Sequence, residues 1–212
     1  MIKNKVSGYI ISLIPIVFFL YPYFLFAQAR FVIGNSTGVY VKMNGGTSTT
    51  PIYLVIDNSA TNSITRTTGW IISEGQYNYV KWNCGTTTGN YIYPFGYSTT
   101  AYLPLTINKT TAGSSNVSAS TWGAAASDNL PWAGISDAGT VAAVGNMYDG
   151  TLGQDGSDEA VIDRWWDVYT SAATTANVTF SYRGAENTMS AGYQTAELAS
   201  QHWTGSIWNN GK

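Results

Sequence analysis

The residues best suited to catalysis are six carboxylic acids within residues 149–167 (DGTLGQDGSDEAVIDRWWD). A glycosidase needs a pair of carboxylic acids, one to protonate the leaving group and one to act as base or nucleophile. Trp165 and Trp166 lie in the same stretch, and sugars stack on such rings. The six acids are Asp149, Asp155, Asp158, Glu159, Asp163 and Asp167. These residues make a glycoside hydrolase one alternative function of the chain.

Two features of this stretch favour a structural role instead. Its first half is rich in glycine and acidic residues, which is typical of a solvated loop. In "VIDRWWDVY" the alternation predicts a strand with Asp163 and Asp167 on one side. Adjacent tryptophans of a strand point to opposite faces, so at most one of them can share a surface with the acids. We therefore favour the structural interpretation over the hydrolase.

The same acidic loop contains enough oxygen atoms to bind calcium, which takes about six to eight oxygen ligands. Glycines at positions 150, 153 and 156 would let the backbone curl round an ion. The spacing differs from that of an EF-hand loop, whose ligands and glycine occupy fixed positions. We expect no cofactor, with calcium as the alternative at Asp149, Asp155, Asp158 and Glu159.

Nucleophilic and zinc chemistry find little support in the sequence. His202 is the only histidine, and there is no G-x-S-x-G elbow to supply a serine nucleophile. Cys84 is the only cysteine, so no internal disulfide can form. Neither residue has carboxylates at zinc-ligand spacing around it. We expect Cys84 to be buried and unreactive, and the protein not to be an enzyme.

The eight tryptophans divide into core and loop positions. Most of them lie in strand patterns, where each ring buries a large apolar area and stabilises a domain without disulfides. Trp132 in "NLPWAG" and Trp208 in "SIWNNG" are expected in loops, where an exposed ring can hold a glycan. A carbohydrate-binding module that uses these two residues is the first alternative function.

The elements that would position these residues follow a predicted secretory signal peptide at residues 1–29. Two lysines form its basic start, residues 9–26 form its uncharged apolar run, and "AQA" offers cleavage after Ala27 or Ala29. A retained membrane anchor is the alternative, because the apolar run is near the length that spans a bilayer. Prolines inside the run favour cleavage. We expect a secreted or cell-surface protein with no membrane insertion after cleavage.

Charge and composition narrow the partners and the fold class. Removal of residues 1–29 removes two lysines, so the formal net charge falls from −2 to −4. Nucleic acid is not expected as a partner, because its binding needs basic residues, whereas a cell-surface or extracellular polymer fits an exported chain. Only 10% of the residues are charged, and Thr, Ser, Gly, Asn, Tyr and Trp abound. This composition favours strands and turns over long helices.

Period-2 alternation recurs along the chain. "PIYLVIDN" places Ile52, Leu54 and Ile56 on one face, and "YNYVKWN" and "NVTFSY" alternate in the same way. The runs before residue 83 are short and closely spaced, which suits coils of a small β-solenoid or one sheet of a sandwich, although no fixed repeat is visible. We predict an all-β fold. An antiparallel, Ig-like β-sandwich at residues 89–212 is preceded by a short-stranded, β-solenoid-like or β-sheet region at residues 30–88.

Residues 91–108 (YIYPFGYSTTAYLPLTIN) contain two aromatic and aliphatic runs, each with a proline. Proline removes a ladder donor, so the runs should lie at a sheet edge or end at a bulge, with residues 98–100 as the loop. Alternation directs Leu103, Leu105 and Ile107 toward the core. A β-hairpin explains every residue type here, whereas a ligand surface explains only the tyrosines.

The pair "YPFG" and "YLPLTI" resembles a hairpin found in many large secreted surface proteins of Bacteroidota that travel by type IX secretion. Further stretches that agree are "GWIISEGQYNYVKWNCGTTTGNY", "VIDRWWDVY", "VTFSYRGAENT" and "LASQHWTGSIWN". The resemblance covers most of residues 30–212 and implies a β-rich region without an assigned function, ahead of further domains and a sorting domain. The chain ends at "SIWNNGK" without a recognisable sorting domain. Either this is the N-terminal part of a longer protein or the export route differs.

The function favoured by the sequence is therefore structural or adhesive. We expect a non-enzymatic, secreted or cell-surface β-rich module, because the core and the hairpins are what the residues clearly encode. The first alternative is a carbohydrate-binding module, and the second is a glycoside hydrolase that uses acids in residues 149–167.

Overall fold

The computed structural model of the chain describes residues 30–34, 38–123, 162, 164–186, 198–203 and 208–210. Strands make up nearly all the regular structure of these residues, and one 3-10 turn, η4 (Gly184–Glu186), is the exception. The strands are β1 (Phe31–Ile33), β2 (Tyr40–Lys42), β3 (Ile52–Ile56), β4 (Ile64–Arg66), β5 (Trp70–Ile72), β6 (Asn78–Trp82), β7 (Gly89–Tyr93), β8 (Gly96–Tyr97), β9 (Ala101–Tyr102), β10 (Leu105–Lys109), β11 (Val117–Gly123), β12 (Arg164–Thr170), β13 (Ala176–Thr179), β14 (Gln201–Trp203) and β15 (Trp208–Asn210). The predicted all-β class is confirmed.

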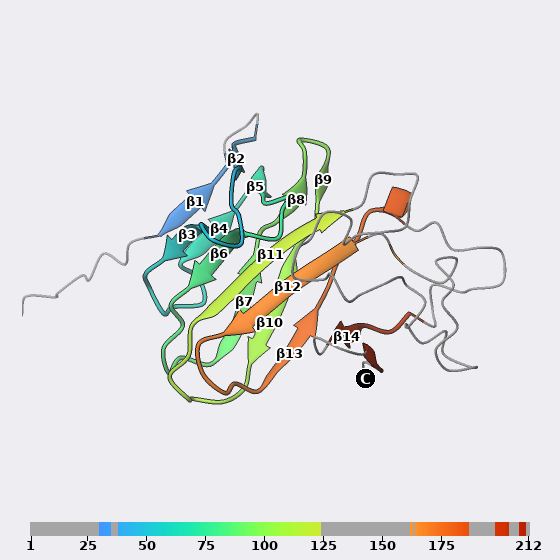
Figure 1. Cartoon of the computed structure of the whole chain (residues 1–212). Helices are drawn as coiled ribbons and strands as arrows, with labels where there is room; N and C mark the ends of the chain where they lie inside the picture. Colours follow the sequence, from blue (N-terminus) through green and yellow to red (C-terminus); the bar gives the residue numbers. More distant parts are fainter. Residues whose placement is uncertain are drawn as a thin grey trace, which may run out of the picture.

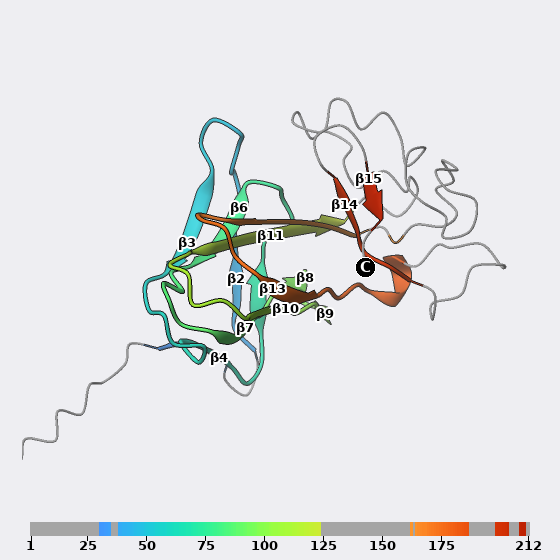
Figure 2. The ribbon, with the colours of Figure 1, turned by 90° about the horizontal axis from the view of Figure 1, so that it is seen from below.

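Two sheets pack face to face and form a β-sandwich (Figures 1 and 2). One sheet has the strand order β12-β11-β6-β3, and the other has the order β13-β10-β7. Neighbouring strands in these two sheets are antiparallel, except for β3 and β6, which are parallel. Figure 2 shows β11 and β12 in one layer and β10 and β13 in the other. The sandwich prediction is therefore confirmed.

The strands between residues 31 and 82 stack as two coils. The first coil contains β1, β2 and β3, and the second contains β4, β5 and β6. Each strand of the first coil pairs in parallel with its counterpart in the second, as β1 with β4, β2 with β5 and β3 with β6. Parallel pairing between successive coils is how a solenoid satisfies its backbone groups. Of the two alternatives predicted for this region, a β-solenoid-like region and a β-sheet region, the parallel stacking fits the first.

The two coils and the sandwich share strands and a core. β6 pairs with β3 of the first coil on one side and with β11 of the sandwich on the other. The buried apolar cluster runs from Ile33 to Ala119. The boundary expected near residue 88 falls in the turn between β6 and β7. The strands on its two sides pack together, since the rings of Trp82 and Tyr91 lie 5.0 Å apart, centroid to centroid.

Alternating side chains fill the space between the two sheets. In β3, Ile56 is buried while Tyr53 and Val55 are exposed, as predicted. Tyr79 in β6 differs from the expectation. Its side chain points away from the core, yet it is buried because aromatic neighbours cover it. Residues 177–182 (NVTFSY) also differ from the expected alternation of buried and exposed side chains. β13 is an edge strand, and Val178 and Phe180, at apolar positions of this run, remain more than a third exposed.

The hairpin prediction for residues 91–108 is confirmed. β7 pairs with β10, and the short strands β8 and β9 continue the hairpin to a turn at residues 98–100. β7 is an edge strand as expected, but β10 is the middle strand of its sheet, so the expected edge position was wrong for the second run. Pro94 and Pro104 lie in the gaps between these strand pairs, where the missing N–H group breaks no ladder bond. Tyr91 and Tyr93 are fully buried, and Leu105 and Ile107 of β10 are buried as well. These tyrosines fill the core and form no ligand surface.

Gly69 allows the two coils to approach closely. Its φ angle is +76°, and a Cβ atom there would lie 1.9 Å from the carbonyl oxygen of Val39 in the first coil. Gly85 also has a positive φ angle, +54°, but has no atom within 4 Å of such a Cβ. Of these two glycines, only Gly69 combines a left-handed backbone with a steric clash.

We predict that Gly69→Ala lowers the free energy of unfolding by about 2 kcal/mol or more, because the side chain adds a clash to the cost of a positive φ. Gly85→Ala is the matched control and should lose only about 1 kcal/mol, the conformational cost alone. Urea unfolding of both variants measures the difference. Equal losses would show that the close approach of the coils at Gly69 does not matter for stability.

Candidate functional site

Most residues of the predicted sites lie outside the described part of the chain. These are Trp132, the calcium-site residues Asp149, Asp155, Asp158 and Glu159, and Asp163. Trp208 was expected in a loop, but it begins strand β15, where it pairs with Trp203 of β14. The loop assignment was wrong because residues 208–210 align with β14 as the second arm of a hairpin. Among the described residues, no group of three or more His, Cys, Asp or Glu could hold a metal ion.

The C-terminal part of the acidic stretch forms β12. Trp165 and Trp166 point to opposite faces of the sheet, as predicted, since their ring partners are Trp122 and Phe95 respectively. Asp167 accepts a hydrogen bond of 2.6 Å from the hydroxyl of Tyr79. Burial, together with this bond, raises the pKa of Tyr79 above its usual value. Asp167 therefore serves as the partner of a neutral phenol.

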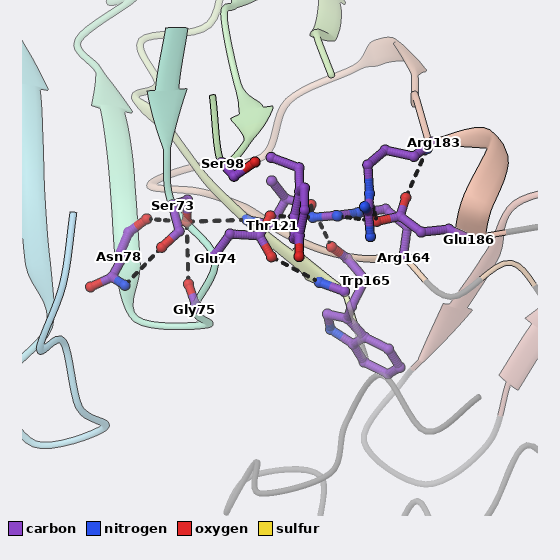
Figure 3. A network of polar contacts seen from close by, with 12 residues as sticks. Ser73, Glu74, Gly75, Asn78, Ser98, Thr121, Arg164, Trp165, Arg183 and Glu186 are labelled. Atoms are coloured by element: carbon purple, nitrogen blue, oxygen red, sulfur yellow. Dashed lines mark hydrogen bonds and ion pairs between the residues drawn. The ribbon is translucent and has the colours of Figure 1, made fainter. Parts of the chain in front are cut away.

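A buried group of charges, the Arg164 clamp, consists of Arg164, Glu74, Glu186 and Arg183 (Figure 3). The guanidinium of Arg164 donates to Glu74 at 2.7 Å, and its second terminal nitrogen donates to Glu186. Arg183 adds a side-chain bond of 2.8 Å and a backbone N–H bond of 2.8 Å to the same Glu186 carboxylate. The side chains of Arg164 and Glu186 are each only 1% exposed.

The clamp joins three parts of the chain that are distant in sequence. Glu74 lies in the turn between β5 and β6, Arg164 begins β12, and Glu186 ends η4 after β13. A neighbouring polar network continues from the turn, where Ser73 Oγ donates to the Asn78 carbonyl at 2.8 Å and Asn78 Nδ2 donates back to the Ser73 carbonyl at 2.9 Å. The clamp thus fastens η4 and β12 to the second coil.

The electrostatics of the clamp suit a structural ion pair better than acid–base catalysis. Burial raises the pKa of Glu186, but the bonds and charge of Arg164 outweigh burial and hold this pKa below its usual value. A general acid needs a carboxyl whose pKa is raised toward the working pH. Glu186 is instead held ionised beside two guanidinium groups. Among the described residues Arg164 Nε is buried without a hydrogen-bond partner, so the guanidinium is held through its two terminal nitrogens, which bond to the two carboxylates and, at 3.4 Å, to Thr121 Oγ1.

Two further reactive groups are also held in structural roles. Lys109 is fully buried, and its ammonium group donates to the carbonyls of Gly85, Thr87 and Gly113 at 2.8, 3.2 and 2.9 Å. Cys84 is fully buried as predicted, and burial raises the pKa of its thiol. A thiol of raised pKa in a closed environment is a poor nucleophile. Lys109 therefore fastens the loops beside the β6–β7 turn, and Cys84 packs in the apolar core.

Two arginines cover the tyrosines of the β8–β9 hairpin. The guanidinium of Arg66 lies 3.7 Å from the ring centroid of Tyr102, and that of Arg183 lies 3.5 Å from the ring centroid of Tyr97. Such cation–π contacts are attractive and also shield the ring faces. Because Arg183 belongs to the clamp as well, it links the hairpin tip to η4. These two ring faces are occupied by the protein itself.

A different group of aromatic residues lies on the outer face of the four-stranded sheet. This tyrosine face consists of Tyr53 of β3, Tyr79 of β6, and Asp167 and Tyr169 of β12. The rings of Tyr53 and Tyr79 are stacked, with centroids 5.4 Å apart and planes 18° apart. Tyr169 meets Tyr79 edge to face at 5.3 Å, and its hydroxyl lies 2.9 Å from that of Tyr53. Tyr53 and Tyr169 remain 41% and 42% exposed.

Sequence reasoning placed Tyr53 and Tyr79 on an outer face but assigned no site to them. The partner Tyr169 lies 116 residues away from Tyr53, and only strand register brings the two together. The alternation of "VIDRWWDVY" carried part of the signal, because it placed Asp167 on one side of its strand. The Arg164 clamp had no comparable signal, since its charges come from unrelated local patterns.

Comparison of the chain with protein-family models, curated proteins and solved structures gives no significant match. In the described part of the chain, no helix has the length and hydrophobicity needed to cross a bilayer. The functional argument therefore depends on the geometry of the clamp and of the tyrosine face.

Proposed function

We propose that this protein is a non-enzymatic, secreted or cell-surface module whose β-sandwich attaches to an extracellular polymer. The observation that carries the proposal is the tyrosine face, which exposes two aromatic rings on a rigid sheet. Buried charges such as Arg164, Lys109 and Glu186 are engaged in structural contacts, which leaves them poorly suited to catalysis. Exposed aromatic rings with hydroxyl groups are the side chains that binding surfaces use most.

The proposed secreted or cell-surface location is inferred from the sequence. Residues 1–29 have the features of a secretory signal peptide, and the resemblance to type IX secretion cargo of Bacteroidota supports export to the cell surface. With a formal net charge of −4 after cleavage, an acidic polymer such as nucleic acid is disfavoured as the partner.

The carbohydrate-binding alternative is favoured by a specific observation, though not at the residues first considered for it. Trp132 lies outside the described residues, and the side chain of Trp208 does as well. The tyrosine face supplies exposed rings at a different place, on β3 and β12. The hydrolase alternative gains no comparable support, because Asp167 is bound to Tyr79.

Retention on insoluble polymers tests the proposed function. Protein recovered from producing cells is incubated with cellulose, chitin, xylan and collagen, and the bound fraction is measured after washing in low and in high salt. We expect retention on at least one polymer, with little loss in high salt because the contact is aromatic. Retention on none of the four, or release of sugar or peptide above that of heat-inactivated protein, would contradict a non-enzymatic adhesion module.

A further inference from the structure

We propose that the tyrosine face is a polysaccharide-binding surface, with Tyr53 and Tyr169 as the residues that contact the sugar chain. This inference rests on the proposed adhesive function and names its ligand class and its site. It concerns residues of β3, β6 and β12, and does not involve Trp132, Trp208 or the acidic loop.

The tyrosine face is formed by side chains that reach toward each other across the sheet. β3 and β12 are the two outer strands of the four-stranded sheet, so their backbones lie about 14 Å apart, three strand spacings. The hydroxyls of Tyr53 and Tyr169 nevertheless lie 2.9 Å apart. Both side chains must therefore lean inward over the two middle strands. Serines on β11 leave room for them, since Ser118 and Ser120 are 2% and 0% exposed.

The rings of the tyrosine face are held rigidly in place. Tyr79 supports both outer rings, Tyr53 by stacking and Tyr169 by an edge-to-face contact. Its own hydroxyl is fixed to Asp167. Each ring is thus held at its backbone and at its hydroxyl end. A ligand that binds to rings already fixed in place causes little further loss of side-chain entropy, which is the main cost of using exposed side chains.

The chemistry of the tyrosine face matches that of a sugar. The hydrogen bond between Tyr53 and Tyr169, together with burial, raises the pKa of Tyr53 to about 12, so its hydroxyl stays neutral. A sugar ring likewise presents an apolar C–H face and a rim of hydroxyls. Two exposed phenol rings offer apolar faces for stacking and hydroxyls for hydrogen bonds in the same place.

The neighbouring residues favour a sugar chain over other occupants. Val55 is 47% exposed and pairs with Lys81 in the next row of the sheet, and Lys81 in turn pairs with Ser118. A stable protein partner would cover about 20 to 30 residues on each side, whereas the tyrosine face consists of four residues. Nucleic acid would call for several cations, whereas this face carries the Asp167 carboxylate, with Lys81 in the neighbouring row. A face of aromatic rings and hydroxyls with one carboxylate and one nearby lysine suits a neutral or weakly charged polysaccharide.

The test compares variants of the full secreted protein in gels that contain soluble xylan, mixed-linkage β-glucan or mannan, and in depletion assays with cellulose and chitin. We expect the wild type to bind at least one of them and Tyr53→Ala with Tyr169→Ala to weaken that binding about tenfold or more. Tyr182→Ala removes a tyrosine of similar exposure, 37%, outside this face, and should bind as the wild type does. Replacement of both residues by phenylalanine should keep most of the binding, because the rings remain.

Hydroxyl-radical footprinting provides a readout without any variant. Hydroxyl radicals should oxidise the exposed rings of Tyr53 and Tyr169 in the free protein, and the bound polysaccharide should protect both residues but not Tyr182, as read by peptide mass spectrometry. Equal polysaccharide binding by the wild type and the double alanine variant, or oxidation unaffected by the polysaccharide, would overturn the site while the adhesive function stands. Retention on collagen alone would overturn the ligand class. Retention on no polymer would overturn the adhesive function itself.

Discussion

Replacing Arg164 with methionine should lower the free energy of unfolding by about 3 to 5 kcal/mol, which is the usual cost of removing one partner of a buried ion pair. Methionine has a similar length and fills much of the space, so the loss reports mainly the charge. Glu74 and Glu186 would lose their shared cation, and Glu186 is only 1% exposed. Urea or thermal unfolding of the purified variant measures the loss.

The physical reason is desolvation of a carboxylate that has lost its best partner. Arg183 still contacts Glu186, but its side chain is 21% exposed and forms the outer part of the clamp. Adding Glu186→Gln to the Arg164→Met variant should restore part of the stability, because the uncompensated charge is then removed. Arg30→Met is the matched control. Arg30 donates to the Thr65 hydroxyl in an exposed place, and its loss should change stability by less than about 1 kcal/mol.

The effect of the Arg164→Met substitution should depend on pH. In the wild type the lowered pKa of Glu186 stabilises the fold above the ordinary carboxyl pKa, and this contribution is lost as the pH falls through the folded-state value. Without Arg164, burial remains and raises the pKa of Glu186, so the charged form becomes a cost near neutral pH. The stability difference between the two proteins should therefore narrow as the pH falls from 7 toward about 4. A difference that stays constant with pH would contradict this account of the clamp.

Local alternation was sufficient to predict the strands and their inner faces. Leu103, Leu105 and Ile107 follow one another at every second position, and all three are at most 2% exposed. A face that packs against a second sheet keeps apolar side chains at every second position, so each run can be interpreted without its neighbours. The same holds for Cys84, whose place beside Trp82 at a strand end predicted its burial.

The pairing of the two coils could not be seen as a repeat. Ile64 follows its partner Phe31 by 33 residues, Trp70 follows Tyr40 by 30, and Asn78 follows Ile52 by 26. The strands stack while the connections between them shorten. A search for one fixed period fails under these conditions, because the period changes at each pair.

The two sites depend on contacts between segments that are distant in sequence. Arg164 lies 90 residues from Glu74, and Tyr169 lies 116 residues from Tyr53. A single sequence predicts which face of a strand a residue occupies, but it does not fix which strands are neighbours or in what register. Charged and aromatic residues in separate strands therefore give no joint signal before the sheet is assembled.

Trp82→Ala should lower the free energy of unfolding by about 3 to 5 kcal/mol, the range found when a large aromatic side chain is removed from a core. The indole is fully buried and lies edge to face with Tyr91 and Tyr93, with ring centroids 5.0 and 5.5 Å away. Its N–H donates to the Asn58 carbonyl at 2.8 Å. The substitution thus leaves a cavity between the two sheets and an acceptor without its donor.

The form of the unfolding curve is as informative as its midpoint. Trp82 belongs to the predicted region 30–88, whereas Tyr91 and Tyr93 belong to the predicted region 89–212, and the three rings pack together. We therefore expect one transition that shifts as a whole when Trp82 is changed, measured by tyrosine and tryptophan fluorescence and by circular dichroism on the same samples. Trp82→Phe, which keeps a ring but loses the bond to Asn58, should shift the same single transition by less. Two transitions, of which only one moves, would mean that the two regions unfold as separate domains despite their shared core.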